Sequence, residues 1–185
     1  MSKSEAKPPL DLLLNLYDDA QAHTMALVRD LSANQLSWRP NEHSSAIGWH
    51  LGHQAAVNHY LVRNLTAAEP SFDVRFDALF DSATPEPDRG ALPPLSEINE
   101  YRSLIATSTH NTISKISAGA VGAPNQLTHI ADGLLRAVIN HEYQHAAWVR
   151  EVRETMTGNL VPQPSDPNLV NVDGYWMVNL AVVDL

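Results

Sequence analysis

One stripe of side chains limits what this chain can fold into. Between residues 131 and 157, the core-type residues recur at spacings of three and four, which is the repeat of one face of an α-helix. The residues on this stripe are Leu134, Val138, His141, His145, Trp148 and Val152. A helix with one long apolar face must bury that face against neighbouring elements. The fold class therefore depends on what the rest of the chain supplies.

The rest of the chain supplies more helices. Apolar residues at the same spacings predict four long helices in all, at residues 10–31, 46–65, 96–118 and 131–157. Strands do not alternate with these helices, which disfavours an α/β fold. The sequence therefore predicts an all-α protein, an up-down four-helix bundle with a long crossover between its second and third helices.

Capping and helix-breaking residues mark the connections. Ser44 or Ser45 is a natural N-cap for the second helix. Residues 66–94 contain five prolines, which are too many for a long regular element. We expect this crossover to be irregular apart from one short helix near residues 74–80.

An extended C-terminal tail, residues 159–185, follows the bundle. Its segment Tyr175 to Val183 is apolar on both faces if it forms a strand, and periodicity does not separate a strand from a short helix here. Such a segment has to be buried. We expect it to pack across the bundle or to support a homodimer, with strand pairing between subunits as one form. At 185 residues the chain has the length of one domain, 1–185, with the core bundle over residues 10–157.

Composition narrows the classes of partner. The chain has 12 Lys and Arg against 21 Asp and Glu, a formal net charge of -9, which disfavours nucleic acid and anionic membranes as partners. It shows no apolar run long enough to span a membrane and no signal peptide, so we expect a cytoplasmic protein. The absence of Cys excludes thiolate nucleophiles and Cys-ligated metals. Any metal has to be held by His, Asp or Glu, and the chain has nine His.

His141 and His145 form the strongest candidate for a metal site. They lie one turn apart on the core stripe, so both imidazoles project to one side and can bind one ion. An unpaired buried ring nitrogen costs about 1–3 kcal/mol, and an ion would satisfy one on each ring. The alternative is a pair of core histidines hydrogen-bonded to hydroxyls or water.

A third ligand has to come from another helix. His50 and His53 both lie in the second helix, beside Gly52, which we expect to allow another helix to approach closely. Spacing does not choose between these two histidines. We expect His59 to be a surface residue, whereas His23 either lines the same cavity or is a hydrogen-bonded core histidine.

The segment His141–His145 also matches the H-E-x-x-H motif of zinc metalloproteases, in which Glu142 would be the general base. Beyond Glu154 no His or Glu follows to complete such a site, and no sheet is predicted to align a peptide. A metalloprotease is therefore a minor alternative. Outside that class, Glu142 is a candidate catalytic base, a partner that fixes an imidazole tautomer, or a solvated surface residue.

Three motifs, in this order, resemble a known family. They are Ser37-Trp38-Arg39-Pro40, Ser45-Ala46-Ile47-Gly48-Trp49-His50-Leu51-Gly52-His53 and His141-Glu142-Tyr143-Gln144-His145. Over residues 10–157 the chain resembles the DinB/YfiT-like superfamily of four-helix metalloproteins. The resemblance implies that His53, His141 and His145 hold a divalent ion and that His50 is not a ligand.

The resemblance also implies a range of functions. Members include transferases and isomerases that use a low-molecular-weight thiol, some hydrolases, and a domain of ergothioneine-forming sulfoxide synthases, whose second catalytic domain is not in this sequence. A three-histidine site with an open position suits Zn²⁺, Ni²⁺ or Fe²⁺. We expect a metal-dependent enzyme acting on a small molecule; the alternative is a non-enzymatic metal-binding or stress-related module.

Overall fold

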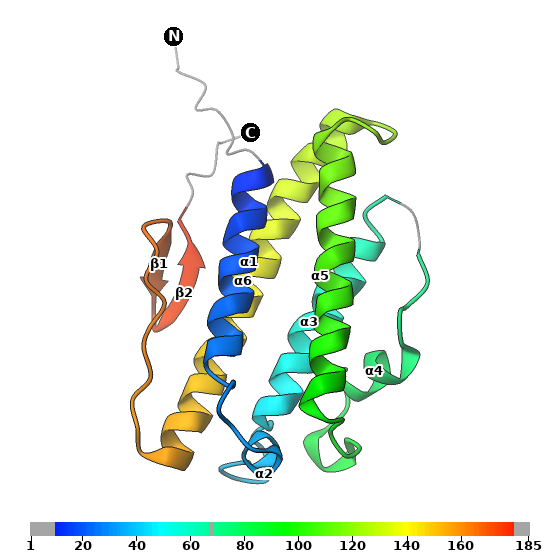
Figure 1. Cartoon of the computed structure of the whole chain (residues 1–185). Coiled ribbons are helices and arrows are strands. Elements are labelled where there is room, and N and C mark those ends of the chain that lie inside the picture. Colours follow the sequence, from blue (N-terminus) through cyan, green and yellow to red (C-terminus); the bar gives the residue numbers. More distant parts are fainter. Residues whose placement is uncertain (1–9, 67–68, 180–185) are drawn as a thin grey trace.

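A computed structural model describes residues 10–66 and 69–179 (Figure 1). This part of the chain is mostly helical, which confirms the predicted all-α class. The helical elements are α1 Leu10–Ala26, α2 Ala33–Ser37, α3 Ile47–Arg63, α4 Val74–Leu79, the short 3-10 helix η1 Glu86–Asp88, α5 Leu95–Ser117 and α6 Pro124–Thr157. Two strands follow, β1 Leu169–Val172 and β2 Tyr175–Val178. Within the described ranges, no helix has the length and apolar character needed to cross a membrane.

The four long helices α1, α3, α5 and α6 lie side by side, and α6 contacts each of the other three (Figure 1). Its buried face is therefore wider than the predicted stripe. Leu135, Ile139 and Val149 are fully buried, whereas Leu134 and Trp148, at one edge of that face, are half-buried. A helix packed on three sides needs more than one apolar row.

The interior contains two apolar clusters with a polar layer where they meet. One cluster is built mainly from α1 and the first half of α6, and the other from α3, the first half of α5 and the second half of α6. The polar layer consists of buried, mutually hydrogen-bonded side chains, namely Tyr17, Gln54, Asn58, Arg102, Thr109 and Glu142. Such a layer is stable only when its members satisfy one another.

Several helix ends differ from the predicted ends, because local caps and turns set them. α6 begins at Pro124 instead of residue 131, since Ala123 adopts the left-handed conformation (φ 52°) and Pro124 presets the first turn. α1 ends at Ala26, several residues earlier than predicted. α3 begins without a side-chain cap, and Ser45 instead donates its hydroxyl to Glu86 at 3.0 Å.

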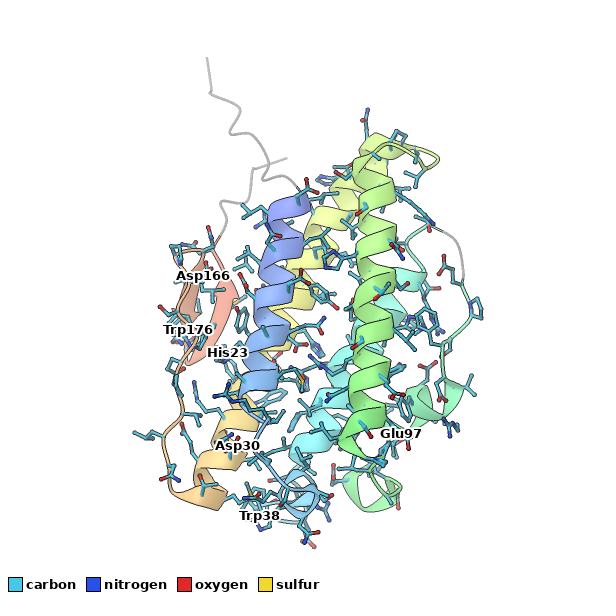
Figure 2. All side chains as sticks on the ribbon, viewed as in Figure 1. His23, Asp30, Trp38, Glu97, Asp166 and Trp176 are labelled. Atoms are coloured by element: carbon cyan, nitrogen blue, oxygen red, sulfur yellow. The ribbon has the colours of Figure 1, made fainter. Side chains whose placement is uncertain are left out.

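The tail forms a hairpin that packs on α6 of the same chain. Asp173 and Gly174 both have positive φ, as the tight turn between β1 and β2 requires. The backbone N–H of Val178 donates to the Asn140 side chain at 2.8 Å, and Trp176 lies on the hairpin (Figure 2). The strand partner thus lies within the tail itself, in β1, which the sequence did not predict. The rest of the predicted apolar segment, residues 180–183, lies outside the described residues.

The crossover brings an aromatic ring against α3. α4 lies within the predicted range, and Phe80 follows it as the C-cap residue. The Phe80 ring occupies the space that a Cβ at Gly52 would need, so a side chain at this position would displace the ring. We expected Gly52 to accommodate another helix; it accommodates a side chain of the crossover instead.

Replacing Gly52 with Ala should destabilise the fold. Replacing an exposed helical Gly with Ala raises the free energy of unfolding by up to about 1 kcal/mol, but overpacking a buried position lowers it by about 1–3 kcal/mol. Urea unfolding of the wild type and the variant measures the change in this free energy. Gly133→Ala, in the open on α6 with nothing near its Cβ, is the matched control and should be stabilising. A Gly52→Ala protein as stable as the Gly133→Ala protein would contradict the close packing of Phe80.

Candidate metal centre

Three histidines from two facing helices converge near the middle of the protein. His53 lies on α3, and His141 and His145 lie one turn apart on α6. One ring nitrogen from each lies within 4.8 Å of those of the other two. His53 and His145 are buried and His141 is half-buried. The structure therefore brings together the three residues that the family resemblance implied, in a group of the type that can hold a metal ion.

A hydrogen bond fixes which ring nitrogen of His53 remains free, and a second one constrains His145. Nδ1 of His53 lies 2.7 Å from the backbone O of Phe80. A carbonyl only accepts, so this nitrogen carries the proton and the lone pair is left on Nε2. Nδ1 of His145 lies 2.9 Å from Nδ1 of His50, so His145 as donor likewise keeps Nε2 free. Spacing did not choose between His50 and His53; in the structure His53 joins the group of three and His50 is hydrogen-bonded to His145.

Burial keeps these imidazoles neutral. Loss of solvent, with help from the neighbouring histidines, lowers the pKa of His50 to about 3 and that of His141 to about 4. The same causes lower the pKa of His145 strongly. Burial also lowers the pKa of His53, although the Phe80 carbonyl acts in the opposite direction. Neutral imidazoles keep the lone pairs that metal coordination requires.

A stack of three planar groups holds the α3 side of the cluster. The Trp49 ring is stacked on His53, with centroids 4.5 Å apart and planes 12° apart. The Arg89 guanidinium lies 3.7 Å from the Trp49 ring centroid, a cation–π contact. Arg89 is held by Ser45 at 2.8 Å and by an ion pair with Glu86. The crossover is thus fastened to α3 beside the histidines.

Two cavities reach His53. The larger, of about 540 Å³, opens on His50, His53 and His145 between the rings of Trp49 and Trp148. The second, of about 360 Å³, reaches His53 past Tyr60, Arg63 and Phe80, among other residues. Both volumes suit small molecules. Both cavities reach His53, and the larger one also reaches His145.

Glu142 points into the polar layer and lines neither of these cavities. Its carboxylate accepts a hydrogen bond from Arg102 Nη2 at 2.6 Å, and the two side chains are 5% and 4% exposed. The sequence left Glu142 as a catalytic base, a partner that fixes an imidazole tautomer, or a solvated surface residue. It is buried and not solvated, and its carboxylate is hydrogen-bonded to Arg102. The H-E-x-x-H spacing is present without the geometry of a metalloprotease.

Two other histidines differ from expectation or fall outside the cluster. His59 was expected at the surface but is buried: its Nε2 accepts from the Phe72 N–H at 3.2 Å and its ring stacks on Phe72. The signal was present, because no charged residue occurs between Ile47 and Val62, and a helix without a charged face is mostly buried. His23 projects from α1 (Figure 2) and contacts Tyr143 instead of lining the cavity.

The fold and the site define a class: a helical protein with a three-histidine group of the metal-ligand type. The model of the DinB superfamily matches residues 16–149. This match covers more than half of the chain, and the chain belongs to the DinB superfamily. A search among curated proteins finds no match.

Acid should destabilise the metal-free protein. An unfolded histidine titrates near pH 6.5, whereas His50 and His141 in the folded state have pKa values of about 3 and about 4. Below pH 6.5 the unfolded state therefore binds protons that the folded state does not. As the pH is lowered below 6.5, the free energy of unfolding therefore decreases. The decrease is up to about 1.4 kcal/mol per pH unit for each such histidine.

Urea unfolding at pH 7 and pH 5 with a chelator present measures this effect. His141→Asn should reduce the difference between the two pH values. His43→Asn is the matched control and should leave the difference unchanged, because the His43 side chain is 85% exposed. Equal pH dependence of the wild type and the His141→Asn protein would contradict the assigned burial effect.

Proposed function

We propose that His53, His141 and His145 bind one divalent ion and that the protein is a metal-dependent enzyme acting on a small molecule. The observation that carries this proposal is the convergence of three imidazoles from two helices beside a cavity of about 540 Å³. A bound Zn²⁺, Ni²⁺ or Fe²⁺ would supply a Lewis acid that lowers the pKa of a water or a thiol. These ions favour imidazole ligands, and the chain offers no thiolate.

The chain's own residues prepare the ligands. The Phe80 carbonyl orients His53, and His50 orients His145, each through the ring nitrogen that faces away from the cluster. Outer partners of this kind typically change metal affinity by about 10–100-fold. Trp49 and Trp148 line the cavity beside the histidines and give it apolar walls. Two of the three proposed ligands, His53 and His145, are thus oriented before any ion or substrate binds.

Two cavities at His53 favour a reaction with two organic reactants. Hydrolysis needs one such reactant and water, whereas transfer or thiol-assisted isomerisation needs room for two. The chain has no Cys, so any thiol has to be a separate molecule. Among the activities implied by the family, we therefore favour a reaction that uses a low-molecular-weight thiol over hydrolysis.

The alternative is a non-enzymatic metal-binding module. A fourth protein ligand and a closed site would support it. In the part of the chain that the structure describes, the ligand group at this site consists of three histidines, and a cavity opens on it. This combination favours catalysis. The ion pair of Glu142 with Arg102 disfavours the metalloprotease alternative.

Replacing any one of His53, His141 or His145 with Ala should remove most of the metal, because two imidazoles bind a divalent ion far more weakly than three. Elemental analysis of the purified variants measures the metal content. His50→Phe is the informative comparison: it should keep the stoichiometry and weaken affinity about 10–100-fold. Unchanged metal content in His53→Ala or His141→Ala would refute the assigned site.

The same variants test catalysis. We expect the metal-loaded protein to consume an added thiol in the presence of a small electrophile, and the His141→Ala protein and the chelated wild type to be inactive. A thiol assay has no background from the protein, because the chain has no Cys. Hydrolysis of ester and amide substrates is screened in parallel. A metal-loaded wild type that is inactive in both screens would favour the non-enzymatic alternative.

We also infer a homodimer formed through the hairpin. Its outward residues are all apolar and partly exposed, namely Val170 at 38%, Val172 at 45%, Tyr175 at 37% and Met177 at 38%. Their pairing in the register places them on one face of the sheet, and a second copy of this face is its expected partner.

Sedimentation velocity at micromolar concentration tests the dimer. Val172→Lys should give a monomer, because it puts a charge into the apolar face. Leu160→Lys, at an 88% exposed position outside the hairpin, should stay dimeric. A wild-type monomer under these conditions would disprove the inference.

A further inference from the structure

One side chain of the polar layer connects α5 to both helices that carry the histidines. Arg102 Nη1 donates to the backbone O of Leu51 at 2.8 Å and to Gln54 Oε1 at 3.2 Å, both on α3. Its Nη2 donates to Glu142 Oε1 on α6 at 2.6 Å. The planar guanidinium presents its donors in a fixed fork. It therefore defines where α3 and α6 lie relative to α5.

A second side chain joins α3 directly to α6. Gln54 Nε2 donates to the backbone O of Glu142 at 2.9 Å. Gln54 follows His53 in the chain, and Glu142 follows His141. The hydrogen bond between the two helices therefore lies one residue away from a candidate ligand on each side.

We propose that Arg102, Gln54 and Glu142 are positioning residues: they set the register of α3 against α6 and thereby the separation of His53 from the histidines of α6. The proposal rests on the proposed metal site. Two of their hydrogen bonds end on backbone carbonyls, so they hold the helices themselves and not only side chains. A helix advances 1.5 Å per residue, whereas metal–ligand distances tolerate about 0.2 Å. A slip by a fraction of one residue would therefore break up the ligand set.

Stability alone is a weak explanation for these residues. An ion pair as buried as Arg102–Glu142 can often be replaced by apolar side chains of similar volume without loss of stability. Nε of Arg102 is buried, and it finds no hydrogen-bond partner among the described residues. The layer thus retains the buried charge of Arg102 at a cost in free energy. Hydrogen bonds of this guanidinium run to residues that neighbour His53 and His141 in the sequence. Apolar packing is not directional and would define the register less sharply.

Two variants test the proposal, and a third is a matched control. Arg102→Met with Glu142→Leu removes both charges, so that neither is left unpaired. Gln54→Leu removes the hydrogen bond from Gln54 to the α6 backbone and keeps the ion pair. Asn58→Leu removes a buried amide from the same helix and layer, but its bonds run to Tyr17 and Thr109, on α1 and α5. The control therefore loses polar contacts without losing a tie to α6.

Two readouts separate positioning from folding. The first is titration with Co²⁺, whose visible absorption reports affinity and coordination geometry. The second needs no metal: spin labels at Tyr60→Cys on α3 and Ala137→Cys on α6, two exposed positions of a chain without Cys, report the distance between these helices. Far-ultraviolet circular dichroism establishes that each variant is folded.

We expect the double variant and Gln54→Leu to bind Co²⁺ about 10–100-fold more weakly than the wild type, the range seen when an outer partner of a ligand is lost. Their Co²⁺ spectra should shift and their spin-label distance distributions should broaden. Asn58→Leu should keep the wild-type affinity, spectrum and distances.

The two proposals fail in different ways. Folded variants with wild-type Co²⁺ affinity and wild-type label distances would overturn the positioning role and leave the metal site intact. A wild type that binds no Co²⁺ would overturn the metal site, while the label distances still decide whether the three residues set the register. If the double variant does not fold, Gln54→Leu against Asn58→Leu decides the question.

Discussion

Burial of charge in the middle of the helices is the constraint on which the centre of this protein depends. The Arg102 guanidinium is 4% exposed and has to meet fixed acceptors, which it finds on α3 and α6. The two apolar clusters on either side supply most of the buried area, but hydrophobic burial has no preferred direction. The hydrogen bonds of the polar layer are directional, and the candidate ligands His53 and His141 are sequence neighbours of two of its members, Gln54 and Glu142. Stability and placement of the site are therefore divided between different parts of the core.

The irregular crossover contributes as much to the site as the helices do. α3 supplies His50 as the partner of His145, but the two helices alone would leave Nδ1 of His53 without its Phe80 partner. The crossover provides the Phe80 carbonyl for His53 and the Arg89 cation over Trp49, and Gly52 on α3 leaves the space that Phe80 needs. A segment that composition marks as irregular thus determines which nitrogen of His53 is free.

What the sequence could reveal follows from the range of the forces involved. Helix positions and the His141–His145 pair are local, and the 3.6-residue repeat exposes them. The early start of α6 depends on the backbone of Ala123 and Pro124, ahead of any apolar stripe. The roles of His50, Arg102 and Phe80 depend on contacts between residues far apart in the chain, and no spacing encodes those. His59 is the instructive intermediate case: the lack of charge along α3 indicated its burial, but its Phe72 partner comes from the crossover.

The H-E-x-x-H segment shows why a motif needs its surroundings. A spacing of four residues places His141 and His145 on one side of a helix in any protein. The spacing alone therefore predicts that the two imidazoles lie together. The spacing does not predict the surroundings of Glu142. Its side chain lies about 100° further round the helix, so its contacts depend on which element packs on that face. In the metalloprotease motif this Glu is the general base. Here its partner is Arg102 from α5, and the carboxylate that would activate water is occupied in holding two helices together. The same five-residue motif therefore specifies a pair of candidate ligands, while the packing of the fold decides what the glutamate does.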